Sequence, residues 1–282
     1  MTSCLLPQRG ILELTGIDRG SFLQGLITNS VDKISTTAAI YSAFLTPQGR
    51  FFHDFFIIEH NDAWLIDCEL DRAENLLNRF NLYKLRSRVN WRDASSEYKV
   101  YASWNDDAKE NSKDSVCFSD PRLPDLGHRI ITKAPLNTDA HFDDYDTLRL
   151  SHGIPDGSRD MPIEKAIILE CGLDELNAVD WRKGCYIGQE LTARTNYRGL
   201  IRKRLLPVKI EGESPAPFTS ILLDGKEVGE MRSSCKESGL ALFRLDKPSL
   251  SAILDATLKC GNAILKPTIP SWVKFQGNQD QN

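Results

Sequence analysis

Several sequence features of membrane and exported proteins are absent from this chain of 282 residues. No run reaches the ~18 consecutive apolar residues that a membrane-spanning helix requires. The segment from Met1 to Glu13 has no basic region followed by an apolar core, so it does not resemble a secretory signal. It also lacks the Arg- and Ser-rich character of a transit peptide. These absences predict a cytoplasmic protein without a membrane partner.

The spacing patterns of metal-binding sites are absent as well. The chain has seven cysteines and five histidines, but no CxxC pair, no Cys/His cluster and no HExxH run. We therefore expect no zinc or iron–sulfur site made by this chain alone. The cysteine number is odd and the cysteines are scattered, which argues against a disulfide framework and for a reducing compartment.

Charge gives little support for a nucleic-acid partner, because the net charge is −4. The exception is local: residues 191–210 contain no acid but six basic residues, Arg194, Arg198, Arg202, Lys203, Arg204 and Lys209. This run predicts either a solvated basic edge or a cradle for a polyanion. RNA binding ranks last, because Tyr197 is the one aromatic residue available there for base stacking.

The most distinctive stretch runs from Trp181 to Arg194 and contains a cysteine between two glycines. Gly184 and Gly188 permit backbone angles that other residues avoid and allow a ligand to approach the main chain. Residues 189–194 favour a helix, so Cys185 is expected near a helix N-terminus, where the dipole and Lys183 would favour the thiolate. The alternative is a small, buried and unreactive cysteine.

The run from Lys183 to Glu190, KGCYIGQE, resembles the signature of the YgfZ family. These are folate-binding proteins that assist iron–sulfur enzymes and share their fold with the glycine-cleavage T-protein. The resemblance implies that Cys185 and Lys183 carry the chemistry of the site. It also implies a set of further ligand-contacting residues in the same stretch: Tyr186, Gln189, Glu190 and Arg194.

Two segments nearer the N-terminus also resemble this family. Gln24, Thr28 and Asn29 lie in an LQG-containing run whose helix end faces the pocket in the family, although capping and packing are the alternative roles. Asp54 matches the second acid of a T-protein strand that contacts folate, and His53 stands in place of the first. Because strand residues alternate faces, Asp54 is a carboxylate on an otherwise apolar face and must have a partner or a ligand.

Arg149 resembles a family arginine that precedes a Gly-Ile-Pro run, here residues 153–155. It could pair with a ligand carboxylate, or it could form a salt bridge between a helix and a loop. The stretch 120–127 matches a family Asp-Pro-Arg segment, and no chemistry is assigned to it.

Periodicity predicts the elements of the chain. The expected helices are 18–29, with Asp18 as N-cap, and 69–81. The expected strands are 11–14, 40–45, 51–58 and 63–68, and the second and third of these form a hairpin through the turn at 46–50. Short apolar runs at 205–210, 219–223, 226–231, 239–244, 251–256 and 262–266 predict an antiparallel barrel. Residues 105–113 and 156–163 are expected to be loops.

The resemblance implies an α+β fold: a T-protein-like body of two intertwined lobes around a central folate pocket, residues 1–204, followed by a small antiparallel β-barrel, residues 205–275. Residues 276–282 are polar and are expected to be disordered. Tetrahydrofolate, or a polyglutamylated derivative, would lie with its pterin at Asp54 and its glutamate tail near the basic residues.

For function, the resemblance implies an accessory protein that binds tetrahydrofolate. It would support assembly or repair of iron–sulfur clusters in client enzymes, including enzymes that modify tRNA, through transient contacts. The alternative is an enzyme, a folate-dependent aminomethyl- or methyltransferase of the T-protein type. Cys185 favours the first reading, because the transferase chemistry relies on a carboxylate and needs no thiol.

Overall fold

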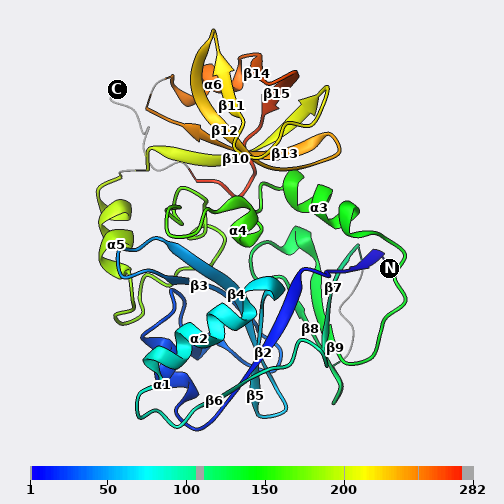
Figure 1. Ribbon diagram of the computed structural model, residues 1–282, viewed down its shortest axis with the longest axis vertical. Helices are drawn as coiled ribbons and strands as arrows, with labels where there is room; N and C mark the ends of the chain where they lie inside the picture. The colour runs from blue at the N-terminus through cyan, green and yellow to red at the C-terminus, as the bar shows by residue number, and fades with distance from the viewer. Residues whose placement is uncertain (1, 106–110, 200, 247, 275–282) are drawn as a thin grey trace. The chain divides into compact units, whose positions relative to one another are not determined.

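The computed structural model describes residues 2–105, 111–199, 201–246 and 248–274 (Figure 1). The predicted tail at 276–282 and most of the predicted loop at 105–113 lie outside the described residues. The chain forms two compact units, and neither is continuous in sequence. The first comprises Met1–Pro47, Phe51–Tyr145 and Leu176–Gln189, and the second comprises Gln48–Arg50, Asp146–Glu175 and Glu190–Asn282. No helix in the described ranges is long and apolar enough to cross a membrane.

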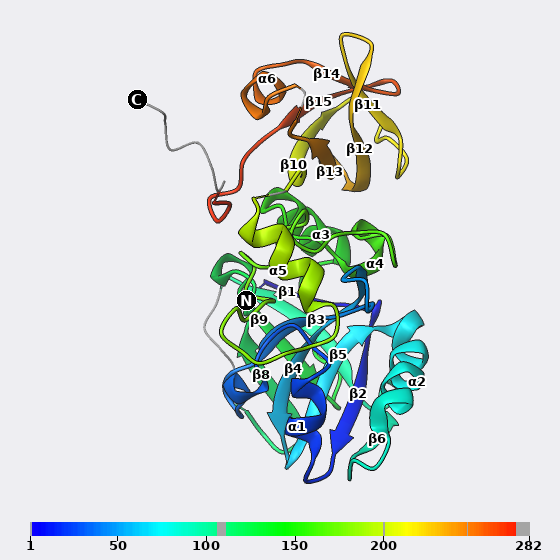
Figure 2. The same cartoon turned by 90° about the vertical axis from the view of Figure 1, so that its left-hand side faces the viewer.

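The first unit contains a five-stranded antiparallel sheet in the order β3-β4-β5-β2-β6. Its strands are β2 (Arg9–Thr15), β3 (Ile40–Leu45), β4 (Phe51–His60), β5 (Ala63–Glu69) and β6 (Asn90–Asp93). The helix α2 (Ala73–Lys84) lies along the sheet (Figure 2) and buries Leu76 and Phe80 in a core shared with it. The predicted hairpin at 40–58 is therefore confirmed, and β4 is buried along almost its whole length.

A second sheet of the same unit has the order β1-β7-β9-β8 and is also antiparallel. It contains β1 (Thr2–Leu5), β7 (Lys99–Trp104), β8 (Ser115–Ser119) and β9 (His128–Thr132).

The first helix is shorter than predicted. Helix α1 covers Arg19–Gln24 and ends with Gly25 as C-cap, although 18–29 was the predicted range. Beyond it the backbone turns to the sheet, because Ile27 forms a β-bridge with Phe44 and the Thr28 N–H donates to Ala43 O at 2.9 Å. Pairing with β3 satisfies these backbone groups without a further helical turn.

The second unit ends in a closed barrel of six antiparallel strands, in the order β10-β13-β12-β11-β14-β15 (Figure 1). They are β10 (Lys203–Glu211), β11 (Ser220–Leu223), β12 (Lys226–Cys235), β13 (Ser238–Arg244), β14 (Leu258–Cys260) and β15 (Ala263–Pro267). The predicted barrel is confirmed, and closure gives every strand two neighbours.

One predicted barrel strand is wrong. Residues 251–256 lie in the helix α6 (Leu250–Leu254), because Ser249 caps its N-terminus by accepting a hydrogen bond from Ala252 N–H at 3.4 Å, and Ile253 faces the core. The predicted loop at 156–163 contains the short helix α4 (Gly157–Asp160). The remaining helices are α3 (Phe142–Ser151) and α5 (Gln189–Tyr197).

Candidate functional site

Cys185 lies in an irregular segment directly before α5 and is the one exposed cysteine of the seven. The buried alternative from the sequence is therefore wrong. Gly188 has φ +83°, a conformation that favours glycine, whereas Gly184 does not adopt a positive φ. A Cβ at Gly184 would have no atom within 4 Å, so this glycine leaves the flank of Cys185 open. The thiol is thus presented at the surface without side-chain cover from its neighbour.

Lys183 anchors the segment that carries Cys185 to the chain after α1. Its Nζ donates to the carbonyl oxygens of Ile27 at 2.6 Å and of Asn29 at 2.7 Å. Partial burial lowers the pKa of Lys183 to about 8. A third link comes from the Ile187 N–H, which donates to Gly25 O at 3.2 Å. The cysteine therefore lies on a short loop fixed on both sides, and whether Lys183 also acts on the thiol stays a prediction.

Thr28 and Asn29 hold the other side of this junction. Thr28 Oγ1 donates to Ala178 O at 2.6 Å, and Asn29 Nδ2 donates to Asn177 O at 2.8 Å and to Tyr41 O at 2.9 Å. Both side chains are buried. These contacts join the N-terminal segment to the stretch that leads into Cys185, which gives both residues a positioning role.

Gln24 stabilises the turn after α1. Its Oε1 accepts from Val31 N–H at 3.0 Å, and its Nε2 donates to Ser30 Oγ at 3.1 Å. Tyr186, the next residue after Cys185, is buried, and the Lys183 ammonium lies 5.4 Å from its ring centroid. Gln189 begins α5, as predicted from the sequence.

Asp54 is buried in β4, as its strand position predicts, and it has a protein partner. Its Oδ2 accepts a hydrogen bond from Tyr41 Oη at 2.8 Å, across the β3–β4 pair. Burial, and then the nearby Asp54 carboxylate, raise the pKa of Tyr41 well above its ordinary value. A neutral phenol can donate or accept a hydrogen bond, and a carboxylate can accept one. The pair can therefore bind both the N–H donors and the acceptor atoms of a heterocyclic amide or amine.

His53 points to the opposite face of β4 and does not join Asp54. Its Nε2 lies 2.9 Å from Asn75 Oδ1 and 3.3 Å from Arg72 Nη2. Burial, together with the Arg72 charge, lowers the pKa of His53 to about 3, so the ring is neutral at physiological pH. His53 therefore cannot stand in for the first acid of the T-protein strand.

Beside Asp54, on the same side of the sheet, lies a buried ionic network that sequence reasoning missed. The guanidinium groups of Arg9, Arg122 and Arg129 lie 5.7, 4.9 and 4.1 Å from the centroid of the Phe56 ring. Arg122 also lies 5.6 Å from the ring of Tyr41, the partner of Asp54. Three cations around one aromatic ring require nearby carboxylates, because buried charges are costly alone.

Asp67 and Asp120 supply those carboxylates. Asp67 accepts from Arg9 Nε at 2.6 Å and from Arg129 Nε at 2.9 Å, and it joins β2, β5 and β9. Asp120 pairs with Arg122 at 2.7 Å. Burial opposes ionisation of Asp120, but Arg122 outweighs it and holds the pKa of this carboxyl below its ordinary value. The Asp-Pro-Arg segment, to which no chemistry was assigned, thus supplies a buried ion pair next to Tyr41, the partner of Asp54.

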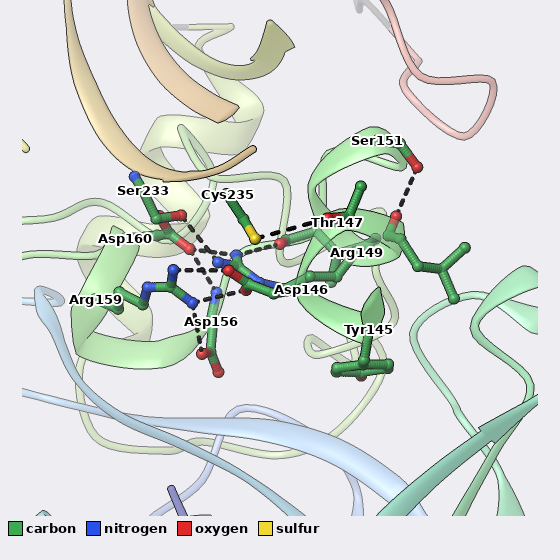
Figure 3. Close-up of polar contacts among 12 residues, drawn as sticks. Tyr145, Asp146, Thr147, Arg149, Ser151, Asp156, Arg159, Asp160, Ser233 and Cys235 are labelled. Atoms are coloured by element: carbon green, nitrogen blue, oxygen red, sulfur yellow. Dashed lines mark hydrogen bonds and ion pairs between the residues drawn. The ribbon is translucent and has the colours of Figure 1, made fainter. Parts of the chain in front are cut away.

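In the second unit, Arg149 has the salt-bridge role that the sequence left open. It is almost fully buried, and it contacts Asp146 and Asp160 at 2.6 Å each and Ser233 Oγ at 2.9 Å (Figure 3). Burial disfavours its charge, yet the carboxylates around it raise the pKa of Arg149 above its ordinary value. Arg149 thus joins α3, α4 and β12 within this unit, and this arrangement favours the structural role over ligand binding.

Of the six basic residues in the predicted run at 191–210, one is not available to a ligand. Arg204 is buried, ion-paired with Glu175 and 3.3 Å from Leu169 O, so it cannot line a polyanion cradle. Arg194 and Arg198 are exposed after the buried Thr192, and Glu190 is exposed in the first turn of α5. In the described part of the chain, no group of three or more His, Cys, Asp or Glu side chains is arranged to hold a metal ion.

Two comparisons with known proteins concern the fold and the C-terminal barrel. The chain resembles the crystal structure of glycine cleavage system aminomethyltransferase T from Bartonella henselae, with a TM-score of 0.68 over 96% of this chain and 86% of that one. At 9% identity this likeness establishes the fold alone. Residues 202–275 match the model of the CAF17 C-terminal beta-barrel domain.

The particular family follows from sequence relatives. The chain is 35% identical to the "Iron-sulfur cluster assembly factor IBA57 homolog, mitochondrial" of Coccidioides immitis, over 98% of this chain and 77% of that protein. It is 33% identical to the protein of the same name from Neosartorya fischeri, over 75% of this chain. It spans 58% of that relative, which is less than two thirds of its length. The chain belongs to the IBA57 family, and the predicted YgfZ resemblance holds at the level of this wider group.

Proposed function

We propose that this chain is an iron–sulfur cluster assembly or repair factor whose reactive group is Cys185. The single observation that carries the proposal is the exposed thiol, held on a loop that Lys183 anchors through two hydrogen bonds of 2.6 and 2.7 Å. The names of its relatives support the same activity. The client enzymes, among which we include enzymes that modify tRNA, would be transient partners.

One thiolate is an incomplete ligand set for a cluster, because [2Fe–2S] clusters take four protein ligands. Among the described residues, no group of three or more His, Cys, Asp or Glu side chains is arranged to hold a metal ion. In the proposed step, the Cys185 thiol loses its proton to solvent and its sulfur replaces one thiolate ligand of the partner protein on an iron of the cluster. The displaced thiolate takes up a proton from solvent, and the partner keeps the other ligands. The cluster is thus cargo that the chain helps to hold during transfer.

We further propose that tetrahydrofolate binds beside Asp54. The residues fit such a ligand in kind: Asp54 can accept hydrogen bonds from a pterin, and Tyr41 can donate or accept. When bound, tetrahydrofolate would supply a carrier of one-carbon units or of reducing equivalents. The role of Asp54 in this site is to orient the ligand.

The alternative, an aminomethyltransferase, has support in the fold and in Asp54. It is weakened by His53, which faces away from Asp54 and is neutral. A turnover assay with tetrahydrofolate and an aminomethyl donor separates the two functions, and we expect no turnover.

The proposed function is tested by rescue of cells that lack their own IBA57 homologue. We expect the Cys185→Ser variant to fail to restore the activities of iron–sulfur enzymes in these cells. The activity of an enzyme without a cluster serves as the reference, and the variant and wild-type proteins are compared at equal abundance. Cys235→Ser is the matched control, since Cys235 is only partly exposed and lies in β12. Full rescue by Cys185→Ser would refute the thiol mechanism.

The compartment is a separate proposal. The sequence predicts the cytoplasm, whereas the names of the relatives place those proteins in mitochondria. Imaging of the tagged protein in its native host decides between the two.

A further inference from the structure

The second unit contains a cavity of about 430 Å³ that none of the predicted site residues lines. Its walls come from the end of α4, the segment after it and the barrel, and every lining residue belongs to this one unit. The residues that matter for its chemistry are Glu170, Lys203, Phe218, Glu230, Arg232 and Leu242. The volume lies within the range of ~300–1,000 Å³ that is usual for pockets that bind small molecules.

Arg232 is the feature that points to a ligand. Its side chain is 5% exposed and its Nη2 donates to Glu230 Oε1 at 2.6 Å. Its buried Nη1 has no hydrogen-bond partner among the described residues. A buried donor without a partner is costly, so a ligand acceptor at this position would recover free energy. Arg232 lies where β12 shifts register between Met231 and Ser234, and such a bulge can redirect a side chain.

The ring of Phe218 packs against the Arg232 guanidinium. The Arg232 guanidinium carbon lies 5.1 Å from the centroid of its ring, although 56% of Phe218 is exposed. Its φ is +66°, a strained conformation for a bulky residue, and its N–H donates to Met231 O at 2.9 Å. Strain of this kind is concentrated at binding and catalytic sites.

Glu170 faces the same cavity as a carboxylate that accepts no hydrogen bond from the described residues. Burial raises the pKa of Glu170, and Lys203, Arg50 and Arg232 oppose this effect. Three cations line the cavity, Lys165, Lys203 and Arg232. Of the acids that line it, Asp160 is already paired with Arg149 and Glu230 with Arg232, which leaves the Glu170 carboxylate to meet a cationic group of a ligand. Arg232 Nη1 and the Glu170 carboxylate together favour a ligand that carries both charges.

We propose that this cavity binds a free α-amino acid with an apolar side chain. Its carboxylate would accept from Arg232 Nη1, its ammonium group would meet Glu170, and its side chain would contact apolar lining residues such as Leu242 and Phe218. A planar guanidinium is well suited to a carboxylate. This site is independent of the proposed folate and thiol functions.

The test is calorimetric titration of the full-length protein with L-leucine, L-phenylalanine and L-methionine. We expect saturable binding of at least one of them at millimolar or lower concentration. Arg232→Met should weaken it by at least about tenfold, because a charge-assisted hydrogen bond is lost. Arg244→Met, which removes an exposed barrel arginine, should leave it unchanged. Glu170→Gln provides a second test in case Arg232→Met does not fold.

Ligand variants define the class. N-acetyl-L-phenylalanine lacks the ammonium group and L-phenylalaninamide lacks the carboxylate, so both should bind at least about tenfold more weakly than L-phenylalanine. Equal binding of the acetylated compound would overturn the amino-acid assignment. So would tighter binding of inorganic phosphate, or no saturable binding of any of the three amino acids.

Discussion

At the residue scale, Lys183 combines two roles that are usually separate, since it is a partly buried ammonium and also the anchor of a surface loop. Replacement by methionine keeps the apolar stem but removes both hydrogen bonds. We expect the Ile187 amide, which is bonded to Gly25 O, to exchange its hydrogen about fivefold faster, equivalent to a loss of ~1 kcal/mol of local stability. Hydrogen exchange followed by NMR measures this. An unchanged rate would show that the loop does not depend on Lys183.

His53 makes stability depend on pH. The folded state binds its proton with a pKa of about 3, against 6.5 for the ordinary value. Between these two pH values the unfolded chain binds more protons than the folded chain does. The contribution of His53 to the free energy of unfolding therefore falls as the pH falls from 6.5 to 3. At pH 5 the loss is about 2 kcal/mol relative to pH 7. We expect His53→Gln to show a correspondingly smaller loss of unfolding free energy in urea. His141→Gln, an exposed control, should behave as wild type.

Asp54 carries the folate proposal. We expect Asp54→Asn to weaken tetrahydrofolate binding by at least about tenfold, because a charge-assisted acceptor becomes a neutral one. His53→Gln is the matched control, since it changes the adjacent residue on the other face of β4. Titration calorimetry on both variants distinguishes a local loss from a general distortion of the strand. Equal weakening in the two variants would argue against a specific role for Asp54.

At the scale of elements, Asp67 joins the two sheets of the first unit, since Arg9 belongs to β2 and Arg129 to β9. Loss of one partner of a buried ion pair costs about 3–5 kcal/mol. We expect Asp67→Asn to lower the unfolding free energy by about 3 kcal/mol, measured in urea. Glu13→Gln breaks a more exposed pair with Arg92 and should cost less than about 1 kcal/mol. Similar losses of unfolding free energy in both variants would contradict the prediction that the buried pair contributes more than the exposed one.

The elements that the sequence predicted well are those with local signals. The hairpin at 40–58 combines two apolar strands with Pro47 and Gly49 in the turn, and α5 follows from the residues after Gly188. The shortened α1 depends on pairing of Ile27 with Phe44, which periodicity does not contain. Residues 251–256 were assigned to a strand from apolar content, whereas the cap at Ser249 was a readable helix signal.

The site was predictable to a similar degree. Cys185 and Asp54 were found because a motif and a charge on an apolar strand are visible in sequence. The network of Arg9, Arg122 and Arg129 was missed, since its members meet only through the packing of two sheets. One available signal was Arg129, a charge within the apolar strand β9. The contacts of Lys183 with Ile27 and Asn29 join residues more than 150 positions apart and have no sequence signature.

At the scale of the whole molecule, the chain consists of two compact units, and Arg149 belongs to the second. We expect Arg149→Met to expose the amides of α4 and β12 to hydrogen exchange, because it leaves Asp160 buried without its cation and Asp146 with Arg159 alone. Protection in β2 to β5 should remain as in wild type. Mass spectrometry of peptic fragments measures both units in one experiment. Equal loss of protection in both units would show that they unfold as one.

The exposure of Cys185 has a practical consequence for handling and study of the protein. Five of the other six cysteines are buried and Cys235 is partly exposed, so a maleimide reagent should modify Cys185 first and in a one-to-one ratio. A fluorophore placed there would report directly on the approach of another protein to this loop. The same exposure means that air oxidation would join two copies through this residue, and storage therefore requires a reductant.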